Sequence, residues 1–299
     1  MATKGLLGWE GATTLMNEHD SYLDFDRIKY LLNPEQFNDV CITVVGLGSG
    51  GAPACDHLVM NGIRKWELYD PDTFDSVNLV KHPRMRKDLG KLKVEIQKEW
   101  IMDRNPDAKV NVFAENVMKS DNFRKSIRHS SLVLSCSDKN SVREFVNDQC
   151  VAEKIPCVTA SVFRTGIGGE IFGYIPQHTG CYRCLQLYSE LNDVNLSDDE
   201  LGLTEEEQQR IYGLGEKEFR ASGLSVDIQA IVLIQVRMAL SILLKDTTSS
   251  MPQLKANWII YANRPSKGIF RSHFEAKQML LRPQQVCNCT EQNITIPEG

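Results

Sequence analysis

The fold is decided by the stretch Cys41-Ile42-Thr43-Val44-Val45-Gly46-Leu47-Gly48-Ser49-Gly50-Gly51. Its apolar start stops at the glycines, which predicts a buried strand of a parallel sheet. Residues 52–61 then predict a helix that ends at Gly62. A strand, a glycine-rich turn and a helix, in this order, form the context that a nucleotide-binding fingerprint requires.

The glycines of this turn are expected to have different roles. The first permits the tight turn, the second lets a phosphate approach the backbone, and the third allows strand and helix to pack closely. The N-terminus of the helix offers free N–H groups to an anion. We therefore expect a nucleotide on Gly46, Gly48, Ser49, Gly50 and Gly51. The alternative is a tight turn that binds no ligand.

Outward from this turn, short apolar segments alternate with helical ones. Strands are expected at residues 66–69, 110–113, 131–135 and 157–162, and helices at residues 90–102 and 141–152. Such alternation predicts an α/β fold with a Rossmann-like, mostly parallel sheet and helices on both faces. Residues 224–244 predict a long buried helix, and residues 258–261 and 269–274 predict late antiparallel strands.

We expect two parts along the chain. Residues 1–40 form a helical lead-in, and residues 41–299 form one domain with a nucleotide-binding half, 41–175, and a C-terminal half, 176–299. In the second half, residues 188–222 are expected to be a long, mobile, inserted loop, in which residues 192–209 are acidic and Thr204 and Glu207 form a capping box for a short helix. This loop is a solvated surface, a flap over the site or a docking surface for a basic partner.

The composition of the 299 residues excludes several classes of protein. With 34 basic and 39 acidic residues the net charge is −5, so no nucleic-acid partner is expected. The most apolar stretch is interrupted by Asp227, Gln229, Gln235 and Arg237, and the first 20 residues lack the pattern of a signal peptide. We expect a soluble, cytoplasmic protein with no membrane partner, whose nine cysteines are thiols or metal ligands.

A carboxylate at the end of the second expected strand extends the predicted site. Asp70 lies nineteen residues after Gly51, where a carboxylate can accept hydrogen bonds from a ribose. Asp72 is assigned to the same site. An aspartate that caps the turn Asp70-Pro71-Asp72 is the alternative, and at this point an NAD-binding dehydrogenase remains open.

A densely basic segment, residues 78–93, favours a triphosphate over a dinucleotide. It contains Asn78, Lys81, Arg84 and Lys93, and lysine and arginine are the side chains that clamp transferring phosphates. A basic, solvent-exposed face is the alternative.

Asp138 follows the fourth expected strand. The carboxyl ends of strands face the ligand crevice of an open α/β sheet, and a carboxylate there suits Mg²⁺. An aspartate that caps the next helix is the alternative.

Two close pairs of cysteines predict a metal site. Two residues separate Cys181 from Cys184, one residue separates Cys287 from Cys289, and Cys287 lies 103 residues after Cys184. Four such thiolates match a tetrahedral zinc site. No open coordination position is implied, so the zinc is expected to be structural and to tie the inserted region to the C-terminus.

Together these motifs resemble those of the adenylating-enzyme family, the ThiF, MoeB and HesA type, and in particular its stand-alone bacterial members. This family includes ubiquitin-activating enzymes, the molybdopterin-synthase and thiamine-biosynthesis adenylyltransferases, and microcin-type peptide adenylators. The resemblance covers residues 27–289 and rests on the glycine loop, Asp70, Asn78-Leu79, Gly90-x-x-Lys93-Val94-Glu95, residues 138–143, Cys181-Tyr182-Arg183-Cys184 and Gly223-Leu224.

The resemblance implies a role for each candidate residue. The glycine loop and Asp70 would hold ATP, the phosphates would contact Asn78, Lys81 and Lys93, and Asp138 would bind Mg²⁺. Arg27 resembles the arginine that reaches into the partner's site in the family's homodimers. The family usually has an arginine where Lys81 stands, so either Lys81 replaces it or Arg84 or Arg86 substitutes for it.

A cysteine that several relatives use is missing here. In those relatives the loop before Gly223-Leu224 carries a cysteine that takes the activated acyl group. Phe219 stands at that position, and no cysteine lies between Cys184 and Cys287. The five cysteines outside the two pairs are expected to be buried and inert, with Cys136 kept as the one candidate nucleophile.

The resemblance implies an ATP- and Mg²⁺-dependent adenylyltransferase that makes an acyl-adenylate and releases diphosphate. The carboxylate is expected to be the C-terminal glycine of a ubiquitin-like or sulfur-carrier protein, with a conjugating or sulfur-transfer enzyme as a further partner. The alternatives are a microcin-type peptide adenylator that clamps its peptide with residues 1–40, a catalytically silent subunit that binds a ubiquitin-like protein, and a dehydrogenase. The presence of Asp70, Lys93 and Asp138 argues against the silent subunit.

Overall fold

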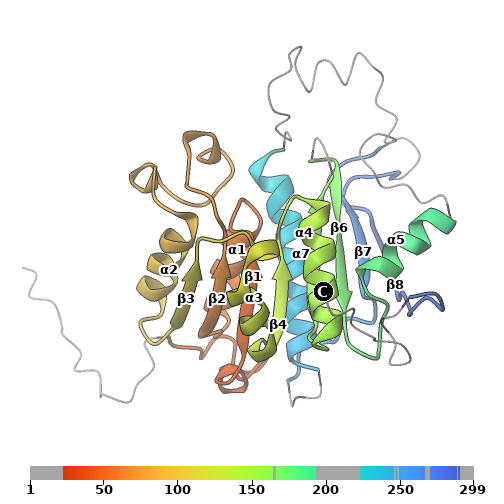
Figure 1. The fold of residues 1–299 in the computed structure, drawn as a ribbon, viewed down its shortest axis with the longest axis horizontal. Helices are drawn as coiled ribbons and strands as arrows, with labels where there is room; N and C mark the ends of the chain where they lie inside the picture. Colours follow the sequence, from red (N-terminus) through yellow and green to blue (C-terminus); the bar gives the residue numbers. More distant parts are fainter. Residues whose placement is uncertain are drawn as a thin grey trace, which may run out of the picture.

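The computed structural model describes residues 23–163, 166–192, 223–245, 247, 249–266, 270–287 and 289. The strands in these residues are β1 (Cys41–Val45), β2 (Lys65–Tyr69), β3 (Lys109–Phe113), β4 (Leu132–Ser135), β5 (Cys157–Val162), β6 (Gly168–Tyr174), β7 (Trp258–Ala262) and β8 (Ala276–Met279). They form one sheet with the order β3-β2-β1-β4-β5-β6-β7-β8 (Figure 1).

The first five strands form the parallel half of the sheet. The strand order reverses between β1 and β4, which both pair in parallel and lie side by side. Val45, the last residue of β1, is in register with Tyr69 of β2 and with Ser135 of β4. The segments that follow these three strands therefore start at one edge of the sheet. In open α/β sheets this point of reversal is where ligands bind.

The last three strands extend the sheet in antiparallel pairs. The sequence correctly predicts a strand at residues 258–261, but its second late strand, 269–274, is wrong. Among residues 270–275, Phe274 has a φ of 60°, and the carboxylate of Glu275 accepts hydrogen bonds from the backbone N–H groups of Arg271 and Ser272. This geometry makes a turn, and the edge strand begins after it at Ala276.

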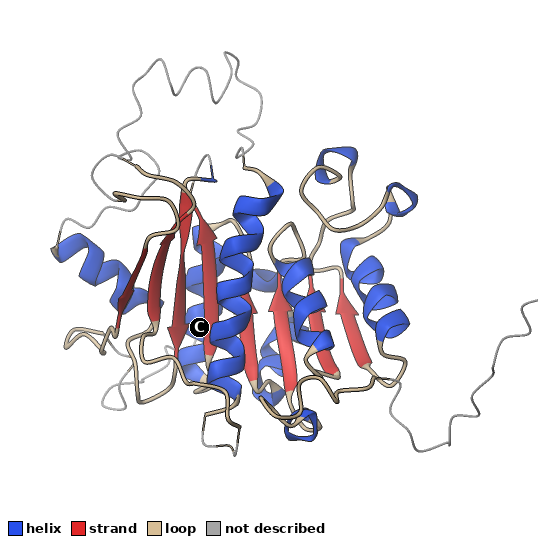
Figure 2. Cartoon of the chain, turned by 180° about the vertical axis from the view of Figure 1, so that it is seen from behind, coloured by secondary structure: helices blue, strands red, loops and turns tan. Residues whose placement is uncertain are grey.

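Helices cover both faces of the sheet, as the sequence predicts (Figures 1 and 2). The α-helices are α1 (Gly51–Met60), α2 (Lys93–Arg104), α3 (Asp121–Ser126), α4 (Asn140–Ala152), α5 (Tyr182–Leu191) and α7 (Ser225–Leu243). Short 3₁₀ turns lie at η1 (Pro34–Phe37), η2 (Ser76–Asn78), η3 (Arg86–Asp88), η4 (Val117–Lys119) and η5 (Ile127–His129). One apolar core joins the sheet to α1, α2 and α7, and a second core joins it to α3, α4 and α5.

Helix α7 has the length and apolar composition of a membrane span, with a mean hydropathy of 1.8. It packs against β5, β6 and α1, and its Ile231 and Ala239 are fully buried. Its composition therefore follows from its place in the core of the domain.

Two further expectations need adjustment. Tyr188–Leu191, expected in the inserted loop, continue helix α5. Residues 193–222 of that loop, including Thr204, Glu207 and Phe219, lie outside the described residues. In the described part of the lead-in, residues 23–40, the structure has turns and the 3₁₀ turn η1 where a helix was expected.

Candidate functional site

The glycine loop connects β1 to α1 at the point where the strand order reverses. Gly46 has a φ of 91°, a region that favours glycine, and a Cβ there would lie 3.1 Å from the backbone of Cys136. A Cβ on Gly51 would lie 1.9 Å from the carbonyl oxygen of Gly46. At Gly48, by contrast, a Cβ would meet no described atom within 4 Å. Gly46 and Gly51 are thus required by packing, whereas Gly48 borders open space.

Asp70, the residue after β2, is buried against this loop. One carboxylate oxygen accepts the backbone N–H of Leu47 at 2.6 Å, and the other accepts the N–H of Asp72 at 2.9 Å. Burial raises the pKa of Asp70, while the nearby Lys93 ammonium and these two hydrogen bonds oppose the rise. The carboxylate therefore fixes the loop and keeps further lone pairs for a ligand.

Lys93 is the first residue of α2, and its side chain reaches the carboxylates of Asp70 and Asp72. Its Nζ lies 2.8 Å from a carboxylate oxygen of Asp72 and 3.9 Å from one of Asp70. The Lys93 side chain is only 10% exposed. A buried ammonium of this kind, held by acidic neighbours, can contact a phosphate.

Asn78 and Lys81 lie in the segment that joins β2 to α2. The side chain of Asn78 accepts the N–H of Asp75, and its backbone carbonyl accepts the N–H groups of Lys81 and His82. Both residues are half-buried. They sit next to His82, whose ring contacts the glycine loop. The structure therefore brings Asn78 and Lys81 near the glycine loop.

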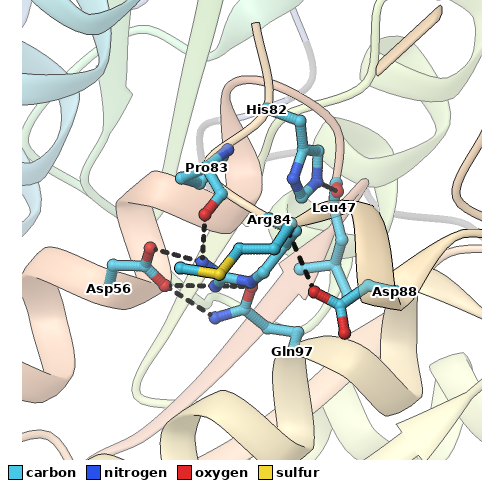
Figure 3. A network of polar contacts seen from close by, with 8 residues as sticks. Leu47, Asp56, His82, Pro83, Arg84, Asp88 and Gln97 are labelled. Carbon is cyan, nitrogen blue, oxygen red and sulfur yellow. Dashed lines mark hydrogen bonds and ion pairs between the residues drawn. The ribbon is translucent and has the colours of Figure 1, made fainter. Parts of the chain in front are cut away.

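Arg84 is part of a buried network (Figure 3). Its guanidinium donates to both oxygens of Asp56 on α1, at 2.9 and 2.5 Å, and to the side-chain carbonyl of Gln97 on α2. It also stacks over the ring of Trp100 at 4.8 Å. Arg84 therefore holds the basic segment to two helices. Arg86 is exposed, whereas Lys81 is half-buried.

Asp138 lies in the turn between β4 and α4. The turn is held by the Nε of Arg143, which donates to the carbonyl of Ser137, and by the N–H of Cys136, which donates to the carbonyl of Val45. The Asp138 side chain is exposed and has no ion-pair partner in the described part of the chain. The close approach of Gly46 to Cys136 places this turn beside the glycine loop.

Arg27 lies apart from these residues. It is exposed, in a turn of the lead-in. The lead-in meets the body of the domain at Gly62, where a Cβ would lie 3.0 Å from that of Pro34. Gly62 follows the C-terminal end of α1, so this contact lies at the opposite end of that helix from the glycine loop.

The side chain of Cys136 packs against the apolar core. Its Sγ contacts the side-chain amide of Gln235 on α7, and burial raises its pKa to about 12. Burial likewise raises the pKa of Cys41 to about 11 and that of Cys55 well above its usual value. Because the nucleophile is the thiolate, these groups are poor nucleophiles at neutral pH.

The four predicted metal ligands form a cluster. The Sγ atoms of Cys181 and Cys184 are 4.0 Å apart, and those of Cys287 and Cys289 lie 3.5 Å from Cys181 and Cys184 respectively. All four sulfurs lie within 4.8 Å of one another. A tetrahedral zinc with bonds of about 2.3 Å requires sulfurs about 3.8 Å apart. The cluster therefore has the size and donor set of a zinc site.

The backbone supports this cluster. The N–H of Gln284 donates to the Sγ of Cys184 at 3.3 Å, which favours its thiolate form. Gly180 allows the C-terminal segment to approach, because a Cβ there would lie 2.8 Å from the carbonyl oxygen of Arg282.

Sequence reasoning missed His82, Asp56 and Gln97. Asp56 carried a signal, because it stands within the apolar run of α1, where a carboxylate needs a partner. Nothing in the spacing of His82 distinguished it from its basic neighbours, since its partner is a backbone carbonyl.

Solved structures with a similar fold include the MccB protein of Escherichia coli. The chain matches this structure with a TM-score of 0.65 and 18% identity, over 89% of the chain and 69% of MccB. A structure of MccB with ATP matches with a TM-score of 0.63 and 16% identity, over 86% of the chain and 68% of MccB.

Sequence relatives share higher identity over a shorter region. The sulfur carrier protein ThiS adenylyltransferase of Escherichia coli is 28% identical over 149 residues, 49% of this chain and 58% of the relative. An adenylyltransferase and sulfurtransferase UBA4 of Yarrowia lipolytica is 33% identical over 144 residues, 48% of this chain and 36% of the relative. The chain thus matches about half, or less, of the length of these relatives.

The match to a family model is more extensive. The model described as the ThiF family matches residues 24–282, which include the glycine loop, the basic segment, Asp138 and one pair of cysteines. This range is most of the chain. The resemblance to the ThiF family that the sequence motifs predict is therefore confirmed. The chain belongs to the ThiF family.

Proposed function

We propose that this protein is an ATP-dependent adenylyltransferase that activates the C-terminal carboxylate of a ubiquitin-like or sulfur-carrier protein. The observation that supports this most is the arrangement of the glycine loop, Asp70, Lys93 and Asp138 around the carboxyl ends of β1, β2 and β4. Relatives named as adenylyltransferases, one of them for the sulfur carrier ThiS, support the same function.

In this proposal the triphosphate lies along the glycine loop and the start of α1. The loop and helix N-terminus supply backbone N–H groups, and Asp70 accepts hydrogen bonds from the ribose. Lys93 would exchange its contact with Asp72 for a phosphate oxygen, and Asn78 and Lys81 would contact the phosphates from the other segment. Asp138, an exposed carboxylate beside the loop, would hold Mg²⁺.

The reaction needs no protein nucleophile. A carboxylate oxygen of the substrate attacks the α-phosphorus, the bond from this phosphorus to the bridging oxygen breaks, and diphosphate leaves with the electron pair. The substrate carboxylate is ionised at neutral pH, so no proton has to be removed. The protein contributes position and compensates the negative charge that develops on the phosphates.

The cysteine cluster is proposed to hold one structural zinc. We further propose that the protein works in the cytoplasm as a homodimer, with Arg27 of each chain serving the site of the other. A conjugating or sulfur-transfer enzyme would then take the acyl group directly from the adenylate, since the described cysteines outside the cluster are partly or fully buried.

Exchange of radiolabelled diphosphate into ATP tests this function. Exchange should require Mg²⁺ and a carboxyl partner, and Asp138→Ala should reduce it on the order of 10²–10³-fold. Asp103→Ala, which removes an exposed aspartate of α2, is the matched control and should exchange like the wild type. Exchange by Asp138→Ala within a few-fold of the wild type would reject the proposed role.

The choice of carboxyl partner separates the candidate functions. A ubiquitin-like or sulfur-carrier protein with a C-terminal glycine should support exchange, whereas a short peptide with the same ending should not. Exchange with the peptide alone would favour a peptide adenylator. An absence of exchange with any partner, despite ATP binding, would favour a silent subunit.

A further inference from the structure

His82 makes a buried contact with the glycine loop. Its Nε2 lies 2.9 Å from the carbonyl oxygen of Leu47. His82 is only 7% exposed, and its ring packs edge-on against the ring of Phe74, with 4.9 Å between the centroids. A carbonyl oxygen only accepts, so Nε2 carries the hydrogen of this bond. The other nitrogen, Nδ1, is buried and has no hydrogen-bond partner among the described residues.

Leu47 is therefore held from two sides. Its carbonyl accepts from His82, and its N–H donates to Asp70 at 2.6 Å. Its side chain is fully buried. A residue that is fixed at its N–H, its carbonyl and its side chain has little freedom to rotate.

This restraint passes to the next N–H group. The peptide between Leu47 and Gly48 is planar and trans, so its carbonyl and its N–H point in opposite directions. With the carbonyl turned towards His82, the N–H of Gly48 points away from it. Among the described residues this N–H has no acceptor, and the space beside Gly48 is open.

The position of His82 is itself fixed by the network of Figure 3. Arg84, two residues on, is bonded to Asp56, which lies on the helix that the glycine loop opens. Gln97 donates to the same carboxylate and accepts from Arg84. The loop, the helix α1 and the basic segment thus form a closed ring of contacts in which His82 is the link to the loop.

We propose that His82 is a positioning residue for nucleotide binding: by donating Nε2–H to the carbonyl of Leu47, it holds the N–H of Gly48 in the direction of the phosphates. This inference rests on the proposed nucleotide site. In this role His82 acts through the backbone of Leu47, without carrying a charge and without contacting the nucleotide.

Two substitutions of similar shape test the hydrogen bond. His82→Gln keeps a side-chain N–H donor, and His82→Met removes it. We expect His82→Met to bind Mg·ATP about tenfold more weakly, which corresponds to the loss of one hydrogen bond. Binding of adenosine should stay within about twofold, and His82→Gln should retain most of the affinity for ATP. A purely structural role would weaken both ligands alike.

Two measurements without nucleotide complete the test. Hydrogen exchange of the loop 46–51 should be faster in His82→Met than in His82→Gln. In the wild type, nitrogen-15 spectra should show Nε2 protonated and Nδ1 bare at neutral pH, whether or not a variant folds. The opposite tautomer of His82 in the wild type would overturn the proposal. Equal hydrogen exchange of the loop, or equal ATP affinity, in His82→Met and His82→Gln would also overturn it. A wild type that binds no ATP but shows the expected tautomer and exchange would instead reject the proposed function.

Discussion

At the scale of single residues, the glycine loop shows which glycines serve the fold and which serve a ligand. Gly46 needs a positive φ and Gly51 has no room for a side chain, whereas Gly48 has neither constraint. The sequence pattern predicted three roles from three positions. The structure is consistent with this division, because the free space lies at the glycine assigned to phosphate approach.

Replacement of Gly48 by alanine should therefore leave the fold intact and impair the ligand. We expect an unchanged melting temperature and an affinity for ATP reduced at least about tenfold, because the methyl group occupies the path of the phosphate. Calorimetric titration and thermal unfolding measure the two effects. Gly51→Ala, whose Cβ would overlap the carbonyl oxygen of Gly46, should destabilise the protein. Wild-type ATP affinity in Gly48→Ala would contradict the assignment.

His82 makes a prediction about pH. Burial, helped by the cations Arg84 and Lys93, lowers its pKa to about 4, whereas an unfolded histidine titrates near pH 6.5. Between these values the unfolded chain binds more protons, so the free energy of unfolding rises with pH and this contribution is complete above about pH 6.5. In urea titrations from pH 4.5 to 6.5, His82→Gln should show a smaller rise than the wild type. An equal rise would show that His82 is not buried in its neutral form.

For several candidate residues the sequence predicted the place in the fold but not the neighbouring side chains. The sequence located Asp70 and Asp138 beside one edge of the sheet, because residues that follow parallel strands must meet there. It assigned Lys93 to the same site only through the basic segment and the family resemblance. It grouped Arg84 with the phosphate ligands, since composition does not reveal a buried partner on another helix. The pairing of Arg84 with Asp56 depends on tertiary contact between segments 28 residues apart.

At the scale of helices and strands, prediction worked where local pattern and tertiary role agree. The five parallel strands were all found, most clearly β1 and β4, which are apolar and buried over almost their whole length. Strand β6, Gly-Gly-Glu-Ile-Phe-Gly-Tyr, was not predicted, because its glycines weaken the local signal. At Gly168 and Gly169 a Cβ would lie within 2.5 Å of a neighbouring backbone oxygen, so the sheet itself requires them. Edge strand β8 is exposed along its whole length and has no alternation to detect.

Helix α5 carries the prediction that concerns the cysteine cluster. Cys181 precedes its first turn and Cys184 lies within that turn, so loss of the metal should release the helix from the C-terminal segment. We expect one zinc per chain after dialysis. Cys287→Ser should lose the zinc and melt at least about 5 °C lower, because a site that closes a long loop stabilises the folded state.

Cys41→Ser is the control for this substitution. Cys41 is a partly buried cysteine of β1, outside the cluster. It should keep one zinc per chain by elemental analysis. A metal-free wild type with the melting temperature of the zinc-treated protein would rule out a structural zinc.

At the scale of the whole molecule, the lead-in and the candidate site lie at opposite ends of α1. This helix has ten residues and is therefore about 15 Å long. Arg27 precedes η1 and is exposed. Arg27 is thus remote from the candidate site of its own chain, and the role proposed for it is in the site of a second copy.

Mixing two inactive variants tests that role. In a twofold dimer of Arg27→Ala with Asp138→Ala, one site carries both substitutions and the other carries neither. Random exchange of equal amounts should restore about a quarter of the wild-type diphosphate exchange, since half of the dimers are mixed and each has one intact site. Either variant alone should remain inactive. No recovery after confirmed subunit exchange would show that Arg27 does not serve the opposite site.

The late position of α7 in the chain has a consequence during synthesis on the ribosome. By Val162 the nascent polypeptide contains all five parallel strands, yet the helix that covers the face of β5 ends at Leu243. Until that residue has emerged, apolar side chains such as Leu134 and Val158, which are fully buried in the folded protein, cannot pack against α7. We expect this interval to be when chaperones that bind nascent chains engage the protein and when truncated translation products aggregate.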